Sequence, residues 1–273
     1  MDDYILNSEH NLTILILSCQ KYSDLWSNNL FLLNKYWPNH PKAILTSDGI
    51  GIFDLSTPEE LMMVKKEASS RLVDSLLKVK TKYVLLTFDD YLINKRVNCE
   101  AINKIIDIMD CHKFGYCRLF KNKKVRGKPI GDFKYKILPL KDVYEVNFYP
   151  SIWNSKSLVS VLKENEDIWK TEVRLTRRMR ERKETGIAIY NKNIFPFIDC
   201  IRKGKYLKPA YKFLKKNKLF VSNRQIRTFQ ETAKLAMQTF VSKYSPDFLK
   251  KIIKKNMRKK GITFYSDFES TDD

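Results

Sequence analysis

The stretch YVLLTFDDY, residues 83–91, indicates the fold more clearly than any other part of the chain. Its first five residues, Tyr83–Thr87, form a short apolar run without polar residues at helical spacing, which is typical of a strand buried on both faces. Two adjacent carboxylates, Asp89 and Asp90, follow directly. We therefore predict a central strand of an α/β sheet that ends in a polar, functional loop.

Two similar segments precede this stretch in the sequence. Leu12–Leu17 (LTILIL) is followed by Ser18–Gln20, and Ala43–Thr46 is followed by Ser47–Gly49. The residues between them, 22–37, have the length and the scattered apolar faces of a helix. Each predicted strand therefore leads into a polar turn, as the strand at 83–87 does.

Further helices and strands are expected after residue 56. Thr57–Lys80 has a capping box at its start and apolar residues at roughly the 3.6-residue period, so it is predicted as a helix. Cys99–Cys111 is also predicted as a helix, Gly115–Leu119 and Val143–Phe148 as strands, and Lys121–Lys136 as a loop or hairpin. This alternation predicts a mostly parallel sheet with helices on both faces.

The polar segments after the first three strands are expected to converge. In open α/β sheets, ligands bind beyond the carboxyl ends of the strands. Asp89 and Asp90 would lie there, where buried carboxylates are unfavourable unless they are paired or bound to a metal. Hard cations such as Mg²⁺ and Mn²⁺ use one or two carboxylates together with substrate phosphates. Alternatively, Asp89 caps a loop and Asp90 is a surface residue.

The net charge of +20 is concentrated near the end of the sequence. Residues 201–260 contain 19 Lys and Arg against Glu231 and Asp247. Such a block indicates an anionic partner, which would be nucleic acid or an anionic membrane surface. The alternative is a strongly solvated lysine-rich face without a partner.

Residues 207–273 are predicted to form a basic helical appendage. Ser222–Gln225 matches a capping box at the start of one helix, and Ser245–Asp247 opens another. The second helix would carry a compact apolar stripe among lysines, as an interfacial helix requires. That stripe consists of Phe248, Leu249, Ile252, Ile253 and Met257.

Several segments, in order along residues 12–206, carry a resemblance to a known family. They are SCQKYSDLW (18–26) with NKYWP (34–38), ILTSDG (44–49), YVLLTFDDYLINKRVN (83–98), YPSIWNSKSL (149–158), EDIWKTE (166–172) and IRKGKY (201–206). With these segments the chain resembles the GT-A-fold glycosyltransferases of bacterial capsule, O-antigen and related surface-polysaccharide loci. The resemblance implies a Rossmann-like GT-A catalytic domain over residues 1–206. It also implies a nucleotide-sugar donor and a glycan or lipid-linked acceptor.

The resemblance also implies roles for particular residues. In that family a strand-end Asp-x-Asp motif, or a variant of it, holds Mn²⁺ or Mg²⁺ on the donor diphosphate. Asp89-Asp90 occupies this place and reads DDY, which departs from the motif. The residues that would contact the nucleotide are Ser18, Tyr22, Ser47 and Asp48.

Glu172 ends the EDIWKTE segment, which resembles the tryptophan–glutamate segment near the acceptor site of that family. A glutamate there would remove the proton of an acceptor hydroxyl. The alternative is a first-turn helix residue with Arg174 and Arg178 nearby. Trp153 and Trp169 would line a sugar platform, or belong to the core.

Other features narrow the class of protein. The GxxxxGK[ST] and GxGxxG fingerprints are absent from the sequence, and its three His residues lie in separate segments without metal-ligand spacing. The first residues lack the basic and apolar regions of a signal peptide, which favours a cytoplasmic protein, peripheral on the inner face of the membrane. The sequence leaves two alternative functions open: a nucleic-acid-binding protein that uses residues 201–260, and a non-catalytic scaffold. It is also compatible with a homo-oligomer.

Overall fold

The structure is a computed structural model of the 273-residue chain. It describes residues 11–49, 60–64, 66–120, 128–130, 133–189, 193–233 and 255–256. The chain divides into two compact units, Met1–Ile198 and Asp199–Asp273. In the described residues, no helix is long and apolar enough to cross a membrane.

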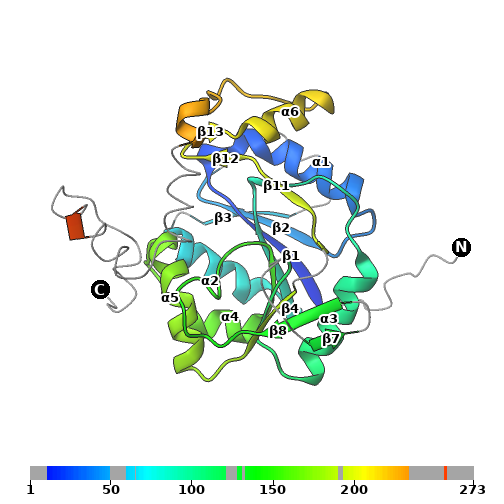
Figure 1. Cartoon of the computed structure of the whole chain (residues 1–273), viewed down its shortest axis with the longest axis vertical. Coiled ribbons are helices and arrows are strands. Elements are labelled where there is room, and N and C mark those ends of the chain that lie inside the picture. Colours follow the sequence, from blue (N-terminus) through cyan, green and yellow to red (C-terminus); the bar gives the residue numbers. More distant parts are fainter. Residues whose placement is uncertain are drawn as a thin grey trace, which may run out of the picture. The chain divides into compact units, whose positions relative to one another are not determined.

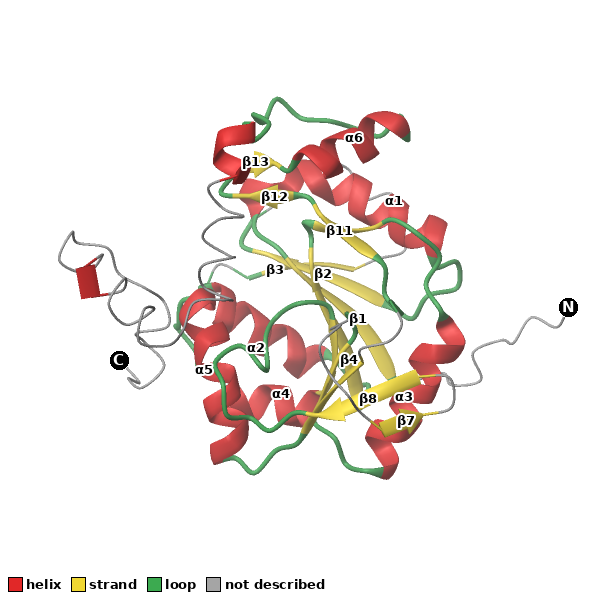
Figure 2. Ribbon diagram, viewed as in Figure 1, coloured by secondary structure: helices red, strands yellow, loops and turns green. Residues whose placement is uncertain are grey.

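A nine-stranded sheet forms the centre of the first unit, in the order β3-β2-β1-β4-β9-β6-β10-β8-β7 (Figure 2). Its strands are β1 (Leu12–Leu17), β2 (Ala43–Ser47), β3 (Glu60–Met63), β4 (Tyr83–Phe88), β6 (Tyr116–Arg118), β7 (Lys128–Ile130), β8 (Phe133–Ile137), β9 (Ser151–Asn154) and β10 (Gly186–Ile189). The first four neighbours in space pair in parallel, and only β9 and β8 run against the other strands. The predicted mostly parallel α/β sheet is therefore confirmed.

Helices cover both faces of this sheet (Figure 1). They are η1 (Gln20–Leu25), a 3₁₀ helix, and α1 (Trp26–Tyr36), α2 (Ala68–Lys78), α3 (Cys99–Cys111), α4 (Ser155–Val161) and α5 (Ile168–Glu181). One core packs α1 and α3 against residues such as Ile14 and Ile16, and the other packs α2, α4 and α5 against Leu15 and Leu17. Alternate residues of β1 thus point to opposite faces, and both faces are buried, which explains its continuous apolar sequence.

Two predicted elements are wrong. Glu60–Met63 forms the edge strand β3, parallel to β2, and the helix begins only at Ala68, with Glu67 at its N-cap. Residues 57–59 of the predicted capping box lie outside the described residues. Val143–Phe148 contains turns and bends, and the strand lies later, at β9, whose pairing between β4 and β6 is antiparallel to both.

Other predicted elements are confirmed within a residue or two. The strands β1, β4 and β6 and the helix α3 lie where the apolar patterns place them. Part of Lys121–Lys136 forms the β7–β8 hairpin, one of the two expected possibilities. A short strand β5 (Tyr91–Ile93), directly after Asp90, pairs with β11 (Phe197–Asp199).

The second unit begins with a small hairpin, β12 (Ile201–Arg202) and β13 (Lys205–Tyr206), followed by α6 (Lys208–Lys216). The capping box predicted at Ser222–Gln225 is wrong. Helical residues begin at Phe229, where Thr228 and Glu231 exchange hydrogen bonds between side chain and backbone. The predicted apolar stripe at 248–257 lies outside the described residues, apart from residues 255–256.

Candidate functional site

Asp89 is the centre of a buried hydrogen-bond network at the carboxyl end of β4. Its Oδ2 accepts a hydrogen bond from the Ser18 hydroxyl, which follows the end of β1. The Trp26 ring nitrogen Nε1 in turn donates to Ser18 Oγ at 2.6 Å. Asn29 of α1 donates from Nδ2 to the backbone oxygen of Asp89 at 3.0 Å. The network therefore fixes both the Asp89 side chain and the loop that carries it.

The Asp89 carboxylate is only 4% exposed. Among the described residues, no Lys or Arg forms an ion pair with it. Burial raises the pKa of Asp89 to about 7, and the charge of Asp24 acts in the same direction, although hydrogen bonds from Ser18, the Asp90 backbone and Trp26 oppose the shift. An ionised Asp89 therefore lacks the positive charge that a buried carboxylate needs.

Asp90 is half-buried and directly precedes β5. Tyr22 lies in η1, where its backbone N–H donates to the Cys19 oxygen at 2.9 Å, and its side chain is half-buried. These two residues therefore lie on the loops that follow β4 and β1, respectively.

A second group of polar contacts joins the loops after β1 and β2. Asp48 is exposed, and its Oδ1 accepts a hydrogen bond from the Gln20 backbone N–H at 2.7 Å. Ser47 is fully buried, and its Oγ accepts a 3.4 Å hydrogen bond from the Gly49 backbone N–H. Arg71 of α2 donates from Nη2 to the Ser18 backbone oxygen at 2.9 Å and lies 3.8 Å from the Asp48 carboxylate. The structure thus connects Ser18, Asp48 and Asp89, as the sequence predicted.

Glu172 lies in the second turn of α5, a helix that packs in the same core as α2. Its Oε1 accepts a hydrogen bond from the Phe148 backbone N–H at 3.0 Å. Burial raises the pKa of Glu172, and the Phe148 hydrogen bond opposes the shift only in part. The alternative expectation is that Glu172 lies in the first turn of a helix, with Arg174 and Arg178 nearby. Glu172 lies instead in the second turn, and both arginines pair with Glu166.

Aromatic rings lie between Glu172 and the Asp89-Asp90 loop. The Phe148 ring lies 6.1 Å, between centroids, from Phe88, which precedes Asp89. Tyr91, which follows Asp90, stacks on Tyr149 at 5.5 Å. Tyr91 and Tyr149 also contact Phe197, at 4.9 and 6.2 Å. Phe148 is buried, but the other four rings are half-buried, and such rings beside carboxylates provide apolar faces on which a sugar ring can stack.

The predicted tryptophan platform is not formed. Trp153 is fully buried in the core and packs against Tyr116, with ring centroids 4.5 Å apart. Trp169 is 56% exposed near the start of α5. The rings near the carboxylates belong instead to residues whose positions follow from tertiary pairing, such as that of β5 with β11.

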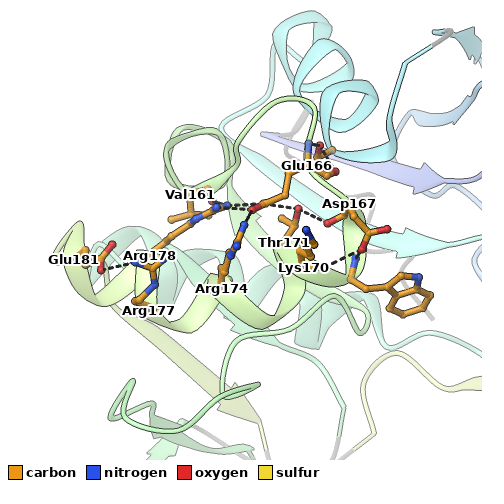
Figure 3. Close-up of polar contacts among 11 residues, drawn as sticks. Val161, Glu166, Asp167, Lys170, Thr171, Arg174, Arg177, Arg178 and Glu181 are labelled. Carbon is orange, nitrogen blue, oxygen red and sulfur yellow. Dashed lines mark hydrogen bonds and ion pairs between the residues drawn. The ribbon is translucent and has the colours of Figure 1, made fainter. Parts of the chain in front are cut away.

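A buried ion cluster holds α5 in place (Figure 3). Glu166, which is 6% exposed, pairs with both Arg174 and Arg178, and it also accepts a hydrogen bond from the Thr171 hydroxyl at 2.7 Å. Its backbone N–H donates to the Ser69 hydroxyl of α2 at 2.9 Å. Burial alone would raise the pKa of Glu166, but the hydrogen bonds from Arg178, Thr171 and Arg174 hold it below its ordinary value. The cluster therefore fixes the helix that carries Glu172.

Some site residues were not found from the sequence. Arg71 lies on the buried face of α2, and the signal was a charged residue among its apolar positions. Trp26 and Asn29 lie in a predicted helix, but nothing in their spacing indicates a bond to Ser18 or the Asp89 loop. Arg118, at the end of β6, is 7% exposed, and its side chain has no hydrogen-bond partner among the described residues.

The residues at the end of β4 fit a hard divalent cation. No group of three or more His, Cys, Asp or Glu residues gathers within metal-binding reach in the described part of the chain. Mg²⁺ and Mn²⁺ need fewer protein ligands when substrate phosphates supply the others. One buried and one half-buried carboxylate match that requirement, since no Lys or Arg in the described segments pairs with the buried one.

No protein-family model and no curated protein matches this chain. Among solved structures, residues 1–349 of S. aureus TarS in complex with UDP-GlcNAc are similar, at 13% identity and a TM-score of 0.48, over 75% of this chain and 64% of that one. Another structure of S. aureus TarS has 14% identity and a TM-score of 0.47, over 68% and 36% of the two chains. The 2-C-methyl-D-erythritol 4-phosphate cytidylyltransferase of Thermus thermophilus has 8% identity and a TM-score of 0.46, over 76% and 98%. The chain thus spans less than two thirds of the TarS chains.

Proposed function

We propose that this protein is a glycosyltransferase that transfers a sugar from a nucleotide-sugar to a glycan or lipid-linked acceptor in bacterial surface-polysaccharide synthesis. The main support is the buried Asp89 carboxylate, which stands at the carboxyl end of a central parallel strand and has no paired cation among the described residues. Ligands of open α/β sheets bind beyond such strand ends. The order of the sequence motifs, which resembles that of GT-A-fold glycosyltransferases, supplies the class of ligand.

The donor would lie over the ends of β2, β1 and β4, which we call the donor side. Asp89 and Asp90 would hold Mg²⁺ or Mn²⁺, which neutralises charge on the donor diphosphate when it is bound. Ser18, Tyr22, Ser47 and Asp48 would contact the nucleotide. Arg71 would keep the first two loops together, because it donates to the Ser18 backbone and lies beside Asp48.

The acceptor would lie beside β9, β6 and α5, which we call the acceptor side. Glu172 would remove the proton of the acceptor hydroxyl, and burial, which raises its pKa, makes it a stronger base than an exposed glutamate. The hydroxyl oxygen then bonds to the anomeric carbon of the donor sugar. The bond from that carbon to the diphosphate breaks, and its electron pair leaves with the diphosphate.

A thermal-shift panel tests the donor assignment. The protein is melted with UDP, GDP, ADP and CMP and their sugar derivatives, with and without Mn²⁺. At least one nucleotide should raise the melting temperature more with Mn²⁺ than without it, and Asp90→Asn should lose that increment. The exposed Asp142 supplies the matched control Asp142→Asn. A panel without any nucleotide response would contradict the proposal.

We propose in addition that the unit of residues 199–273 lies on an anionic membrane surface. Phe220, Ile226 and Phe229 are 45%, 38% and 85% exposed, and the exposed lysines Lys212, Lys215, Lys216 and Lys218 precede them in the sequence. Exposed apolar side chains favour insertion at lipid headgroups over binding of nucleic acid, which mainly needs the positive charges.

Vesicle co-sedimentation tests the membrane assignment. Vesicles with phosphatidylserine should bind the protein in a salt-sensitive manner, and vesicles of phosphatidylcholine alone should not. Phe229→Ser should weaken binding, whereas the control Gln230→Ser, also exposed, should not. Tighter binding to single-stranded DNA than to the anionic vesicles would instead support the nucleic-acid alternative.

A further inference from the structure

Arg118 is a buried cation for which the described chain supplies no anion. It is the last residue of β6 and is 7% exposed. Its Nε is buried without a hydrogen-bond partner, and no carboxylate in the described residues forms an ion pair with its guanidinium. A buried guanidinium without a partner is strongly unfavourable, and the usual compensation is a carboxylate or a phosphate.

The surroundings of Arg118 place it on the acceptor side. β6 and β4 run in the same direction, since both pair antiparallel with β9, and Arg118 and Leu86 both lie opposite Ser151. The carboxyl end of β6 therefore lies at the same edge of the sheet as the Asp89-Asp90 loop. One strand, β9, separates them.

A continuous series of aromatic contacts joins Arg118 to that loop. Its guanidinium carbon lies 4.9 Å from the centroid of the Phe120 ring, and Phe120 lies 4.9 Å from Tyr149. Tyr149 stacks on Tyr91, the residue after Asp90. A guanidinium stacked on a ring keeps its planar fork of N–H donors oriented, and this fork matches two oxygens of one anionic group.

Arg118 also lies near the proposed base. Tyr116 and Arg118 are two residues apart in β6, so their side chains share one face of the sheet, the face that α5 covers. Burial raises the pKa of Tyr116, the Arg118 charge lowers it, and the Glu172 charge raises it. Both charges therefore lie close to the same phenol, although no ion pair joins them.

We propose that Arg118 binds an anionic group, a carboxylate or a phosphate, on the acceptor, so that the enzyme selects acidic sugars as acceptors. This inference rests on the proposed glycosyltransferase function. Arg118 lies away from the donor side, where the diphosphate would bind between the ends of β1 and β4. Its partner is therefore the molecule whose hydroxyl lies near Glu172.

Binding of three simple sugars tests the inference. Methyl β-glucuronide, methyl β-glucoside and glucose 6-phosphate are titrated into the whole protein with UDP and Mn²⁺ present. At least one of the two anionic sugars should bind about 10-fold or more tightly than the neutral glucoside, as expected for charge-assisted hydrogen bonds. The glucuronide identifies a carboxylate as the preferred group, and glucose 6-phosphate identifies a phosphate.

Variants then assign the preference to Arg118. Arg118→Met should remove it, Arg118→Lys should retain part of it, and the exposed control Arg96→Met should leave it unchanged. UDP affinity with Mn²⁺ should be unaltered in all three, and circular dichroism melting verifies that each variant folds. The comparison of the three sugars on the wild-type protein tests the proposal even if a variant does not fold.

The failures of the two proposals can be told apart. If UDP or another nucleotide binds with Mn²⁺ but the wild-type protein binds all three sugars equally, the acidic acceptor is excluded and the glycosyltransferase proposal stands. If Arg118→Met weakens nucleotide binding, Arg118 serves the donor diphosphate and the inference is overturned. If no nucleotide binds, both proposals fail.

Discussion

Two buried carboxylates in this protein have opposite surroundings. Glu166 on the acceptor side is paired with Arg174 and Arg178, and its pKa is held below its ordinary value. Asp89 on the donor side has no paired cation in the described chain, and burial raises its pKa to about 7. A carboxylate whose charge the chain balances by itself needs no ligand, whereas one left without a cation indicates a ligand.

The comparison predicts the largest effect on stability at Glu166. Glu166→Gln removes the negative charge that pairs with the buried Arg174 and the half-buried Arg178, so the free energy of unfolding should fall by about 3–5 kcal/mol. The measurement is urea denaturation at pH 7. The exposed control Glu164→Gln should change it by less than about 0.5 kcal/mol. A loss below about 1 kcal/mol for Glu166→Gln would show that the ion cluster is not structural.

Glu172 is the carboxylate on the acceptor side that should affect turnover. Glu172→Gln should lower turnover by about 10²–10⁴-fold, the usual contribution of a positioned base, and leave nucleotide binding unchanged. Glu164→Gln again serves as the control. Near-normal turnover would give Glu172 the structural role of holding the Phe148 backbone.

The pH dependence of activity should also depend on the titration of Glu172. A base acts only when it is deprotonated, and burial raises the pKa of Glu172, so kcat/KM should begin to fall at a pH above the ordinary glutamate value. The residual activity of Glu172→Gln should lack this acidic limb. An unchanged limb in that variant would assign it to another group.

The two buried carboxylates should respond to pH in opposite ways. Glu166 has a lowered pKa, so its stabilisation is present above its unfolded pKa near 4.5 and is lost as the pH falls. Asp89 has a raised pKa, so the folded protein binds its proton more tightly, and stability declines as the pH rises from about 4 to about 7.

Asp89→Asn should therefore remove the decline, and at pH 7 it should raise the free energy of unfolding by about 1 kcal/mol or more in the absence of metal. Urea denaturation across this pH range measures it. An unchanged profile in Asp89→Asn would show that Asp89 is already compensated in the folded protein.

The donor side was largely predictable from the sequence. β1 and β4 are continuous apolar runs because parallel central strands are buried on both faces, and polar residues follow each run. The sequence therefore indicated that Ser18, Asp48 and Asp89 lie at one edge of the sheet. It could not show that no described Lys or Arg pairs with Asp89, because that depends on which side chains of distant segments reach it.

The acceptor side was less predictable because its elements depend on tertiary pairing. Ser151–Asn154 is short and inserts antiparallel between β4 and β6, so its sequence carries no strong periodic signal. Val143–Phe148 reads as a strand by composition, but Val146, Asn147 and Phe148 are buried in turns and bends. The absence of an ion partner for Arg118 among the described residues is likewise a property of the folded chain.

The claim that Asp89 and Asp90 form a cation site is tested most directly by the binding of Mn²⁺ itself. Electron paramagnetic resonance of free Mn²⁺ during titration with the protein, in the presence of UDP or the nucleotide that gives the largest thermal shift, counts the bound ions. We predict one bound Mn²⁺ per wild-type or Asp142→Asn chain, and strongly reduced binding to Asp89→Asn and Asp90→Asn. Equal Mn²⁺ binding by the wild-type protein and both site variants, or none by the wild-type protein, would contradict the account.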